Sequence, residues 1–196
     1  MSMFTASPHR PDWNHLFKTA VGQEGLFTTR QAAEAGYSPQ LLVHYVHRGR
    51  VARVLHGIYR LVHFPAVDHE ELVTAWLWSD LVGVVSHQTA LSLHGLSDAL
   101  PSKVHLTLPL AWRKRRLRVP EGIVLHYADV SQQDRSWFEA VPITSPGRSL
   151  VDCAHDGLSP DLLQQAAQQA VRRGLVAKAQ LDDVNEALKP FGKRAA

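Results

Sequence analysis

The segment 37–61, "YSPQLLVHYVHRGRVARVLHGIYRL", constrains the fold most, because it specifies a short helix and then a hairpin. Ser38 is a good helix N-cap, and Gly49 suits the left-handed residue that ends a helix. After Gly49 the sequence alternates between apolar and polar residues, and His56 and Gly57 can form a tight hairpin turn. The segment therefore predicts a capped helix followed directly by two antiparallel strands.

Two further helices are predicted before this segment. The pattern "DWNHLFKTAVG" indicates a helix over 13–22 with Asp12 as its cap, and "TTRQAAEAG" indicates a short Ala-rich helix capped by Thr28 or Thr29. Three helices and then a hairpin is the order of elements in a winged helix-turn-helix. We predict that fold, as a DNA-binding domain, for residues 1–66.

The pattern changes after "VHFPAVD". The stretches "KVHLTLP", "GIVLHYAD" and "AVPITS" are strand-like, and "LVGVV" indicates a short buried strand or a helix end. Helical patterns begin at "DHEELV", "HQTALS", "GRSLVD", "DLLQQA" and "KAQLDD", and Ser86 is the expected cap of the second of these. The predicted class is therefore α+β, with residues 67–196 forming a mixed α/β domain that has a helical C-terminal tail.

Composition narrows the environment. The single cysteine, Cys153, excludes an internal disulfide and a Cys-cluster zinc site, and it suits a reducing compartment. The start of the chain, broken by Pro8 and Pro11, lacks a signal-peptide pattern, and the most apolar run is interrupted by Asp80 and is short for a bilayer. We expect a cytoplasmic protein with no membrane partner.

Positive charge is concentrated in the helix and hairpin. Residues 28–60 contain five arginines and one glutamate, a local charge of +4 that exceeds the formal charge of +3 for the whole chain. Duplex DNA favours such a concentration, because each neutralised phosphate releases a condensed counterion. Exposed polar residues of the helix could contact base edges while the arginines hold the backbone. The alternative is a solvated basic face on a small helical domain.

A second basic stretch, "WRKRRLR", begins at Trp112. Its bases are Arg113, Lys114, Arg115, Arg116 and Arg118. They could contact phosphates that flank the first site or an acidic protein, or they could belong to a solvated loop between strands.

Histidines do not form a recognisable metal motif in the sequence. His44 and His47, like His87 and His94, have helical spacing, but no cysteine or carboxylate completes a set of ligands. The sequence therefore predicts no metal site and no cofactor.

The sequence also gives little indication of a catalytic nucleophile. Ser145 precedes a proline and lies near Asp152 and Cys153, but Ser-Pro is a common helix opening that this chain uses three times, and no GxSxG elbow is present. We predict that Ser145 is a cap, that there are no catalytic residues and that the protein is not an enzyme.

The segment "GLFTTRQAAEAGYSPQLLVHYVHRGRVARVLHGIYRL" resembles the N-terminal winged helix of AbiEi-type antitoxins from type IV toxin–antitoxin systems. The stretches "VVSHQTALSLHGLSDALPSKVHLTLP" and "ITSPGRSLVDCAHDG" resemble the domain that follows, so the resemblance covers roughly residues 13–160. It implies a repressor that binds the operator of its own operon. It also implies an antitoxin that opposes a nucleotidyltransferase-like toxin without a stable complex, with neutralisation associated with segments 86–96 and 145–152.

Taken together, charge, helix position and resemblance define the predicted DNA-binding residues. They are Thr28, Thr29, Arg30, Ser38, Gln40, Leu41, His44, Arg48, Arg50, Arg53, His56 and Arg60. The expected partner is the double-stranded DNA of the protein's own promoter, which a homodimer could bind. Two alternatives stay open, a winged-helix module for protein interaction and a transcriptional regulator without antitoxin activity.

Overall fold

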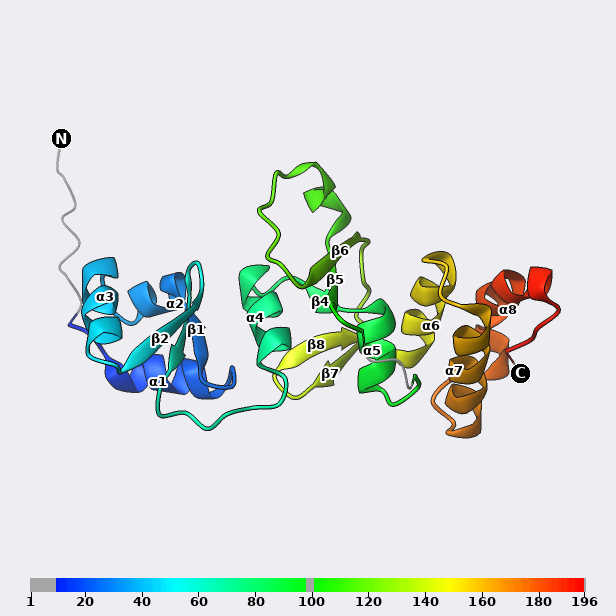
Figure 1. Cartoon of the computed structure of the whole chain (residues 1–196), viewed down its shortest axis with the longest axis horizontal. Coiled ribbons are helices and arrows are strands. Elements are labelled where there is room, and N and C mark those ends of the chain that lie inside the picture. The colour runs from blue at the N-terminus through cyan, green and yellow to red at the C-terminus, as the bar shows by residue number, and fades with distance from the viewer. Residues whose placement is uncertain (1–9, 98–100, 196) are drawn as a thin grey trace. The chain divides into compact units, whose positions relative to one another are not determined.

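A computed structural model describes residues 10–97 and 101–195, and it divides into two compact units, Met1–Trp78 and Ser79–Ala196 (Figure 1). Each unit combines helices with its own β-sheet, so the chain is α+β as predicted. No helix among the described residues is both long enough and apolar enough to cross a lipid bilayer.

The first unit contains the three helices and the hairpin that the sequence predicts. Its elements are α1 (Trp13–Val21), β1 (Leu26–Thr28), α2 (Thr29–Glu34), α3 (Pro39–His47), β2 (Val51–Leu55), β3 (Ile58–Leu61) and α4 (Glu70–Trp78). The three strands form an antiparallel sheet in the order β1-β3-β2, which places β3 in the centre. Strand β1 was not predicted, because three residues carry too little pattern to reveal a strand.

Local capping explains where these helices begin. The side chain of Asp12 accepts a hydrogen bond from the backbone N–H of His15, and Ser38 accepts one from the N–H of Leu41. Thr28 accepts from Gln31 N–H while the Gln31 side chain accepts from Thr28 N–H, a reciprocal capping box. These contacts confirm the three predicted caps.

The core of the first unit lies between α1, α3 and the sheet. Leu16, Phe27, Leu42 and Val51 are almost completely buried in it. Gly25 has φ +82°, and a Cβ there would lie 2.5 Å from the ring of Phe64, so both backbone conformation and close packing require glycine.

Helix α4 packs with the first unit. It contacts β1 and β3, and Glu70 at its start forms an ion pair with Arg60 of β3 at 3.1 Å. The first compact unit therefore ends at Trp78, twelve residues beyond the domain boundary of 66 that the sequence suggested.

The second unit is built on a mixed five-stranded sheet in the order β6-β5-β4-β8-β7. Its strands are β4 (Val84–Val85), β5 (Val104–Leu108), β6 (Ile123–Tyr127), β7 (Arg135–Phe138) and β8 (Val141–Thr144). The pairs β5–β6 and β4–β8 are parallel, and the other two pairs are antiparallel. Three of the strands and the short strand at "LVGVV" match the predicted ones, whereas β7 was missed.

Helices complete the second unit. They are α5 (His87–Leu93), α6 (Pro146–His155), α7 (Pro160–Arg172) and α8 (Asp182–Leu188), with 3-10 turns at η1 (Leu110–Lys114), η2 (Lys178–Gln180) and η3 (Lys189–Phe191). Helix α5 packs against β5 and β8, and α6 packs against α5, α7 and α8. Buried leucines such as Leu91, Leu150 and Leu163 join these helices into one core.

Two serines at helix starts behave differently. Ser145 accepts from the N–H of Arg148 and caps α6, as predicted. Ser86 occupies the N-cap position of α5, as predicted, but its side chain makes no capping bond and contacts His87 and Thr107 instead.

Candidate nucleic-acid interface

Helix α3 presents a polar outer face. Gln40, His44 and Arg48 follow one another at four-residue spacing, so they lie on consecutive turns of the same side, and all three are exposed. Leu42 faces the opposite way and is 1% exposed in the core. Burial on one side thus fixes which side chains α3 offers to a partner.

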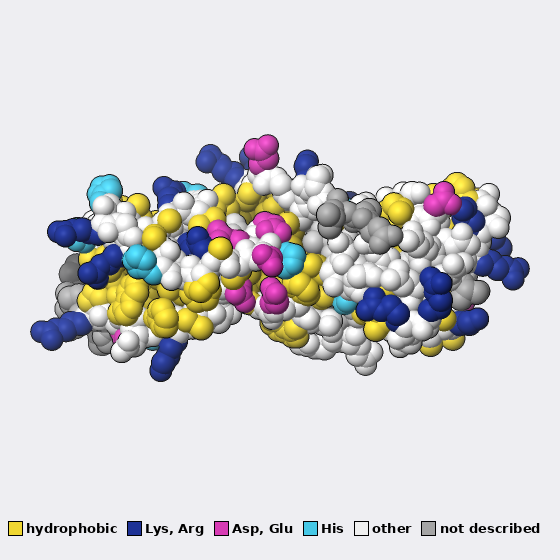
Figure 2. Space-filling model, turned by 60° about the horizontal axis from the view of Figure 1, so that its bottom comes forward, with side chains coloured by type: hydrophobic (Ala, Val, Ile, Leu, Met, Phe, Trp, Pro, Cys, Tyr) yellow, Lys and Arg dark blue, Asp and Glu magenta, His cyan; other side chains and the backbone are white. Residues whose placement is uncertain are grey.

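A hollow of about 510 Å3 lies beside this face. Leu41, His44, Tyr45, Arg48 and Arg50 line it. The guanidinium carbon of Arg50 lies 5.4 Å from the centre of the Tyr45 ring, which is within range of a cation–π interaction. The hollow therefore brings two arginines and a histidine together at the C-terminal end of α3. Figure 2 shows basic and histidine side chains lying among apolar ones on the surface of this unit.

The hairpin β2–β3 is held against α2 by its turn. Both the backbone N–H and the hydroxyl of Thr29 donate to the carbonyl of Gly57, at 2.8 Å and 3.2 Å. Near the turn, exposed Arg53 places a guanidinium nitrogen 2.6 Å from Nδ1 of His56. The hairpin thus presents a cation from a fixed position relative to the helices.

Several predicted residues make contacts within the fold. Thr28 and Ser38 use their hydroxyls as caps, and Thr29 holds the hairpin turn, so their side chains position backbone. Arg30 is exposed and lies 3.7 Å from Glu34 one turn later on α2. The side chains of these residues therefore hold the fold together and leave less of themselves free to contact a partner.

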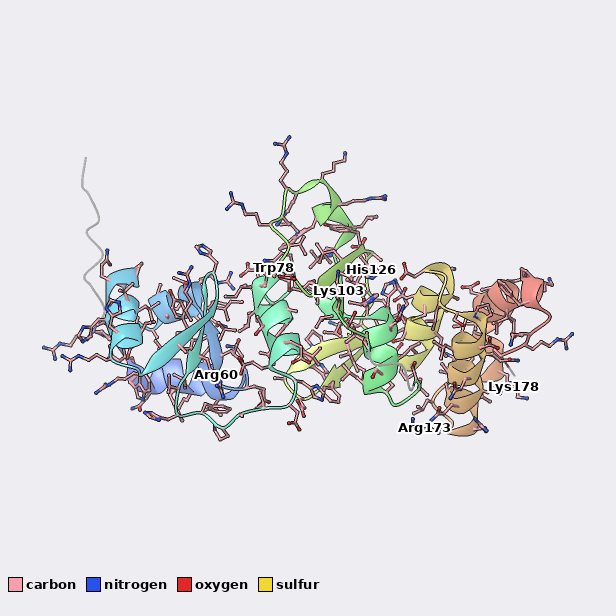
Figure 3. The ribbon with its side chains drawn as sticks, viewed as in Figure 1. Arg60, Trp78, Lys103, His126, Arg173 and Lys178 are labelled. Carbon is pink, nitrogen blue, oxygen red and sulfur yellow. The ribbon has the colours of Figure 1, made fainter. Side chains whose placement is uncertain are left out.

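Arg60 differs from the other arginines (Figure 3). Its guanidinium pairs with Glu70 and donates to the carbonyls of Phe64 and Pro65, each at 3.3 Å, and its side chain is 24% exposed. A cation neutralised in this way has little charge left for a phosphate. We therefore leave Arg60 out of the DNA face, although the sequence placed it there. The reason is its position on the central strand of the sheet, where α4 supplies a carboxylate.

The second basic stretch lies in the loop between β5 and β6 of the second unit. Arg113, Lys114, Arg115, Arg116 and Arg118 are all exposed. The guanidinium carbon of Arg115 lies 3.9 Å from the centre of the Trp112 ring, so this tryptophan is already stacked on an arginine. Figure 3 shows long side chains of this loop projecting away from the sheet.

Ser145, Asp152 and Cys153, which the sequence offered as a possible catalytic group, each make contacts within the fold. Cys153 is completely buried, and burial raises the pKa of its thiol. Burial also raises the pKa of Asp152, although its ion pair with Arg148, at 2.7 Å, opposes that rise. The hydroxyl of Ser145 is used as the cap of α6. In the structure the three residues thus serve as a helix cap, an ion-pair partner and a core side chain.

The sequence paired His87 with His94, but the structure pairs His87 with other histidines. His94 contacts the carbonyl of Thr144 at 2.8 Å, while His87 packs against His105 and His126. Each of the last two histidines occupies a predicted strand, and only the parallel pairing of β5 with β6 brings them together. The signal in the sequence was a histidine inside each of two predicted strands.

Fold and site together define a two-unit α+β protein whose first unit presents exposed cations around a short helix and a hairpin. Residues 16–62 of this unit match the model of a protein family described as "Transcriptional regulator, AbiEi antitoxin". The match extends from α1 to the end of β3 and confirms the resemblance to the AbiEi antitoxin family inferred from the sequence.

Comparison with solved structures finds similarity to the crystal structure of the RV2827C protein from Mycobacterium tuberculosis. The two chains are 15% identical with a TM-score of 0.46, and the alignment covers 96% of this chain and 80% of that one. Among curated proteins, none matches this chain.

Proposed function

We propose that the first unit is a winged helix-turn-helix that binds duplex DNA, with α3 in the major groove and the β2–β3 hairpin as the wing. Helix α3 has the length and the exposed polar face that groove recognition needs. Arg48 and Arg50 at its end and Arg53 on the hairpin would hold phosphates on either side.

The observation that carries the proposal is the grouping of exposed cations within the segment that matches a family of transcriptional regulators. Arg48, Arg50 and Arg53 occupy the end of α3 and the strand after it, and the carboxylate of Glu70 is committed to Arg60 instead. Because unpaired surface cations release counterions from DNA most effectively, this is the surface where DNA binding is expected.

In this proposal the protein is a cytoplasmic repressor of its own operon and the antitoxin of a type IV pair. Its toxin would be a nucleotidyltransferase-like protein encoded nearby, opposed without a stable complex. The family description supports regulation and antitoxin action. The second unit would carry neutralisation, and the protein would bind its operator as a dimer, without a catalytic activity of its own.

Fluorescence anisotropy tests the DNA part. The full chain is titrated into a labelled fragment from upstream of its own gene and into a shuffled fragment of equal length and composition, at the same salt concentration. Specific binding should be at least ~10³-fold tighter than binding to the shuffled DNA. Equal affinities would refute operator recognition and favour a docking module for proteins.

Co-expression tests the antitoxin part. A neighbouring nucleotidyltransferase-like gene is induced alone and then together with this chain, and growth is measured. We expect rescue of growth, also with a variant in which Arg48, Arg50 and Arg53 are replaced by glutamine, because neutralisation is assigned to the second unit. Absence of rescue by the unmodified chain would refute the antitoxin assignment.

A further inference from the structure

Three histidines from separate segments meet in the second unit. His87 is the first residue of α5, His105 lies in β5 and His126 lies in β6. One ring nitrogen from each lies within 4.8 Å of the other two. Nδ1 of His105 is 3.0 Å from Nε2 of His126, and the His87 ring stacks on that of His126 with centres 3.5 Å apart. Figure 3 labels His126 beside α5.

Strand register explains how two of these rings share a face. His105 pairs with Val124, and His126 pairs with Thr107, in the parallel ladder of β5 and β6. Partners in register, and residues two apart on one strand, point to the same side of a sheet. His105 and His126 therefore lie on one face, offset by two residues, and the contacts of α5 with β5 place His87 there too.

The arrangement is costly for a purely structural core. His87 is 7% exposed and His105 is 9% exposed, and polar rings buried in this way lose their hydrogen bonds to water. His87 also has φ +52°, a left-handed conformation that an L-residue adopts at a cost of ~1–2 kcal/mol. Apolar side chains would fill this space without the cost of burying polar rings, so the grouping of three imidazoles calls for a function.

We propose that His87, His105 and His126 bind one divalent transition-metal ion, with Zn²⁺ the best match and a fourth position open to water or to another ligand. Imidazole nitrogen is a preferred donor for zinc, and a site with three histidines leaves one tetrahedral position free. Zn–N bonds of about 2.0–2.1 Å require donor atoms roughly 3.4 Å apart. Nδ1 of His105 and Nε2 of His126, at 3.0 Å, are already close to that spacing, and a nitrogen of His87 lies within 4.8 Å of both.

Neighbouring hydroxyls fix the orientation of the His87 ring, as hydrogen-bond partners of metal-binding histidines usually do. Ser86 Oγ lies 2.9 Å from Nδ1 of His87, and it accepts a hydrogen bond from Thr107 Oγ1 at 2.7 Å. When Nδ1 donates to this hydroxyl, Nε2 carries the free lone pair that a metal needs. This contact explains why the Ser86 hydroxyl makes no capping bond although Ser86 is the N-cap residue of α5. Thr89 of α5 ties the helix to β5, since its hydroxyl accepts from His105 N–H and donates to the carbonyl of Lys103.

Charges around the cluster are compatible with a bound cation. Burial lowers the pKa of each of the three histidines, so they are neutral, and therefore able to coordinate, near neutral pH. Asp156, which follows α6, opposes burial by raising the pKa of His105 and of His126, and Asp152 of α6 also raises the pKa of His126. Arg148 of α6 lowers the pKa of His87 further. The second carboxylate oxygen of Asp152 is buried without a hydrogen-bond partner. A cation at the histidines would offset that negative charge.

Isothermal titration calorimetry with Zn²⁺ tests the proposal. The full chain is treated with a chelator, exchanged into metal-free buffer near neutral pH and titrated with Zn²⁺ alone. The variant His126→Gln removes one donor, and His155→Gln is the matched control, since His155 is an exposed histidine on α6. Circular dichroism checks that each variant is folded.

We expect one Zn²⁺ per chain for the unmodified protein and for His155→Gln. Since loss of a supporting contact alone weakens metal sites by about 10–100-fold, His126→Gln should lose at least that much affinity. Equal affinity of His126→Gln and the unmodified chain would overturn the proposal.

A measurement on the unmodified chain covers the case in which the variant does not fold. Co²⁺ bound in place of Zn²⁺ should give the intense visible absorption of a tetrahedral, nitrogen-ligated ion. Zn²⁺ added afterwards should abolish this absorption. The weak spectrum of hydrated Co²⁺, unchanged by the protein, would overturn the proposal.

Discussion

Arg53 and Arg60 both lie on the hairpin, but the structure places them in different surroundings, and one experiment can test whether only Arg53 contacts DNA. Arg53 is exposed near the turn, whereas the guanidinium of Arg60 is bound to Glu70 and two carbonyls. Replacing each by glutamine removes the same charge. Under the proposed function only the loss of Arg53 should alter DNA binding, because Arg53 is exposed whereas the charge of Arg60 is neutralised by Glu70.

The expected magnitude follows from counterion release. One lost phosphate contact lowers the slope of log K against log salt by ~0.9. The change in binding free energy is this change in slope multiplied by RT and by the natural logarithm of the salt concentration. At about 0.15 M salt the loss is ~1 kcal/mol, or roughly fivefold in Kd. At about 0.05 M salt it rises to ~1.6 kcal/mol, or roughly 15-fold. The effect should be the same for operator and shuffled DNA, since phosphates carry no sequence information.

Anisotropy titrations across a salt series measure both variants. Arg60→Gln should keep the slope of the unmodified protein but lower the free energy of unfolding by about 1–3 kcal/mol, because Glu70 and two carbonyls lose a charged partner. Urea denaturation gives that second value. An unchanged slope for Arg53→Gln, or a flatter slope for Arg60→Gln with intact folding, would refute the assignment of these residues.

Three further predictions follow from single positions. Gln40→Ala should cost about 1–3 kcal/mol at one base pair only, which a panel of single-substitution operators would show as a loss of preference there; uniform weakening at every position would argue against base contact. Gly25→Ala should destabilise the chain by roughly 2–5 kcal/mol, since it adds left-handed strain to a clash with Phe64, and urea denaturation showing less than about 1 kcal/mol would contradict the packing. The pKa of His87 is lowered to about 3, chiefly by burial and further by His126, His105 and Arg148, so the unfolded chain takes up protons first as the pH falls below the ordinary value of 6.5. Stability of the metal-free chain should therefore be complete above that value and fall in acid, by ~2 kcal/mol at about pH 5, and urea midpoints that stay constant between neutral pH and about pH 5 would exclude a buried neutral His87.

The sequence predicted those features that neighbouring residues determine. Asp12, Thr28 and Ser38 were identifiable as caps because a cap bonds to a backbone group only a few residues away. The outer face of α3 was equally accessible, since helical spacing alone separates His44 from buried Leu42.

Features that depend on distant pairing were missed. Arg60 alternates with apolar residues as an exposed wing arginine would, and nothing local shows that β1 pairs with β3 or that α4 brings Glu70 to it. His105 and His126 are 21 residues apart, and only the parallel register of their strands places Nδ1 of one ring 3.0 Å from Nε2 of the other. Strand pairing is selected by the fold as a whole, so periodicity within one segment cannot predict it.

The reassignment of Arg60 also bears on how many copies bind DNA. In the proposed function Arg48, Arg50 and Arg53 are the phosphate contacts of the first unit, so one copy should give a salt slope of about −2.7 and ~3 kcal/mol of counterion release at about 0.15 M salt. Non-specific DNA binding alone needs roughly 5–8 kcal/mol, so three contacts are insufficient and two copies, with a slope of about −5.4, would suffice. The second basic stretch is the competing source of charge, and a variant with glutamine at all five of its bases distinguishes the two. A slope near −5.4 that this variant retains, together with two chains per DNA fragment in sedimentation, would establish a dimer; a slope that falls to about −2.7 in the variant would assign the missing contacts to the loop between β5 and β6.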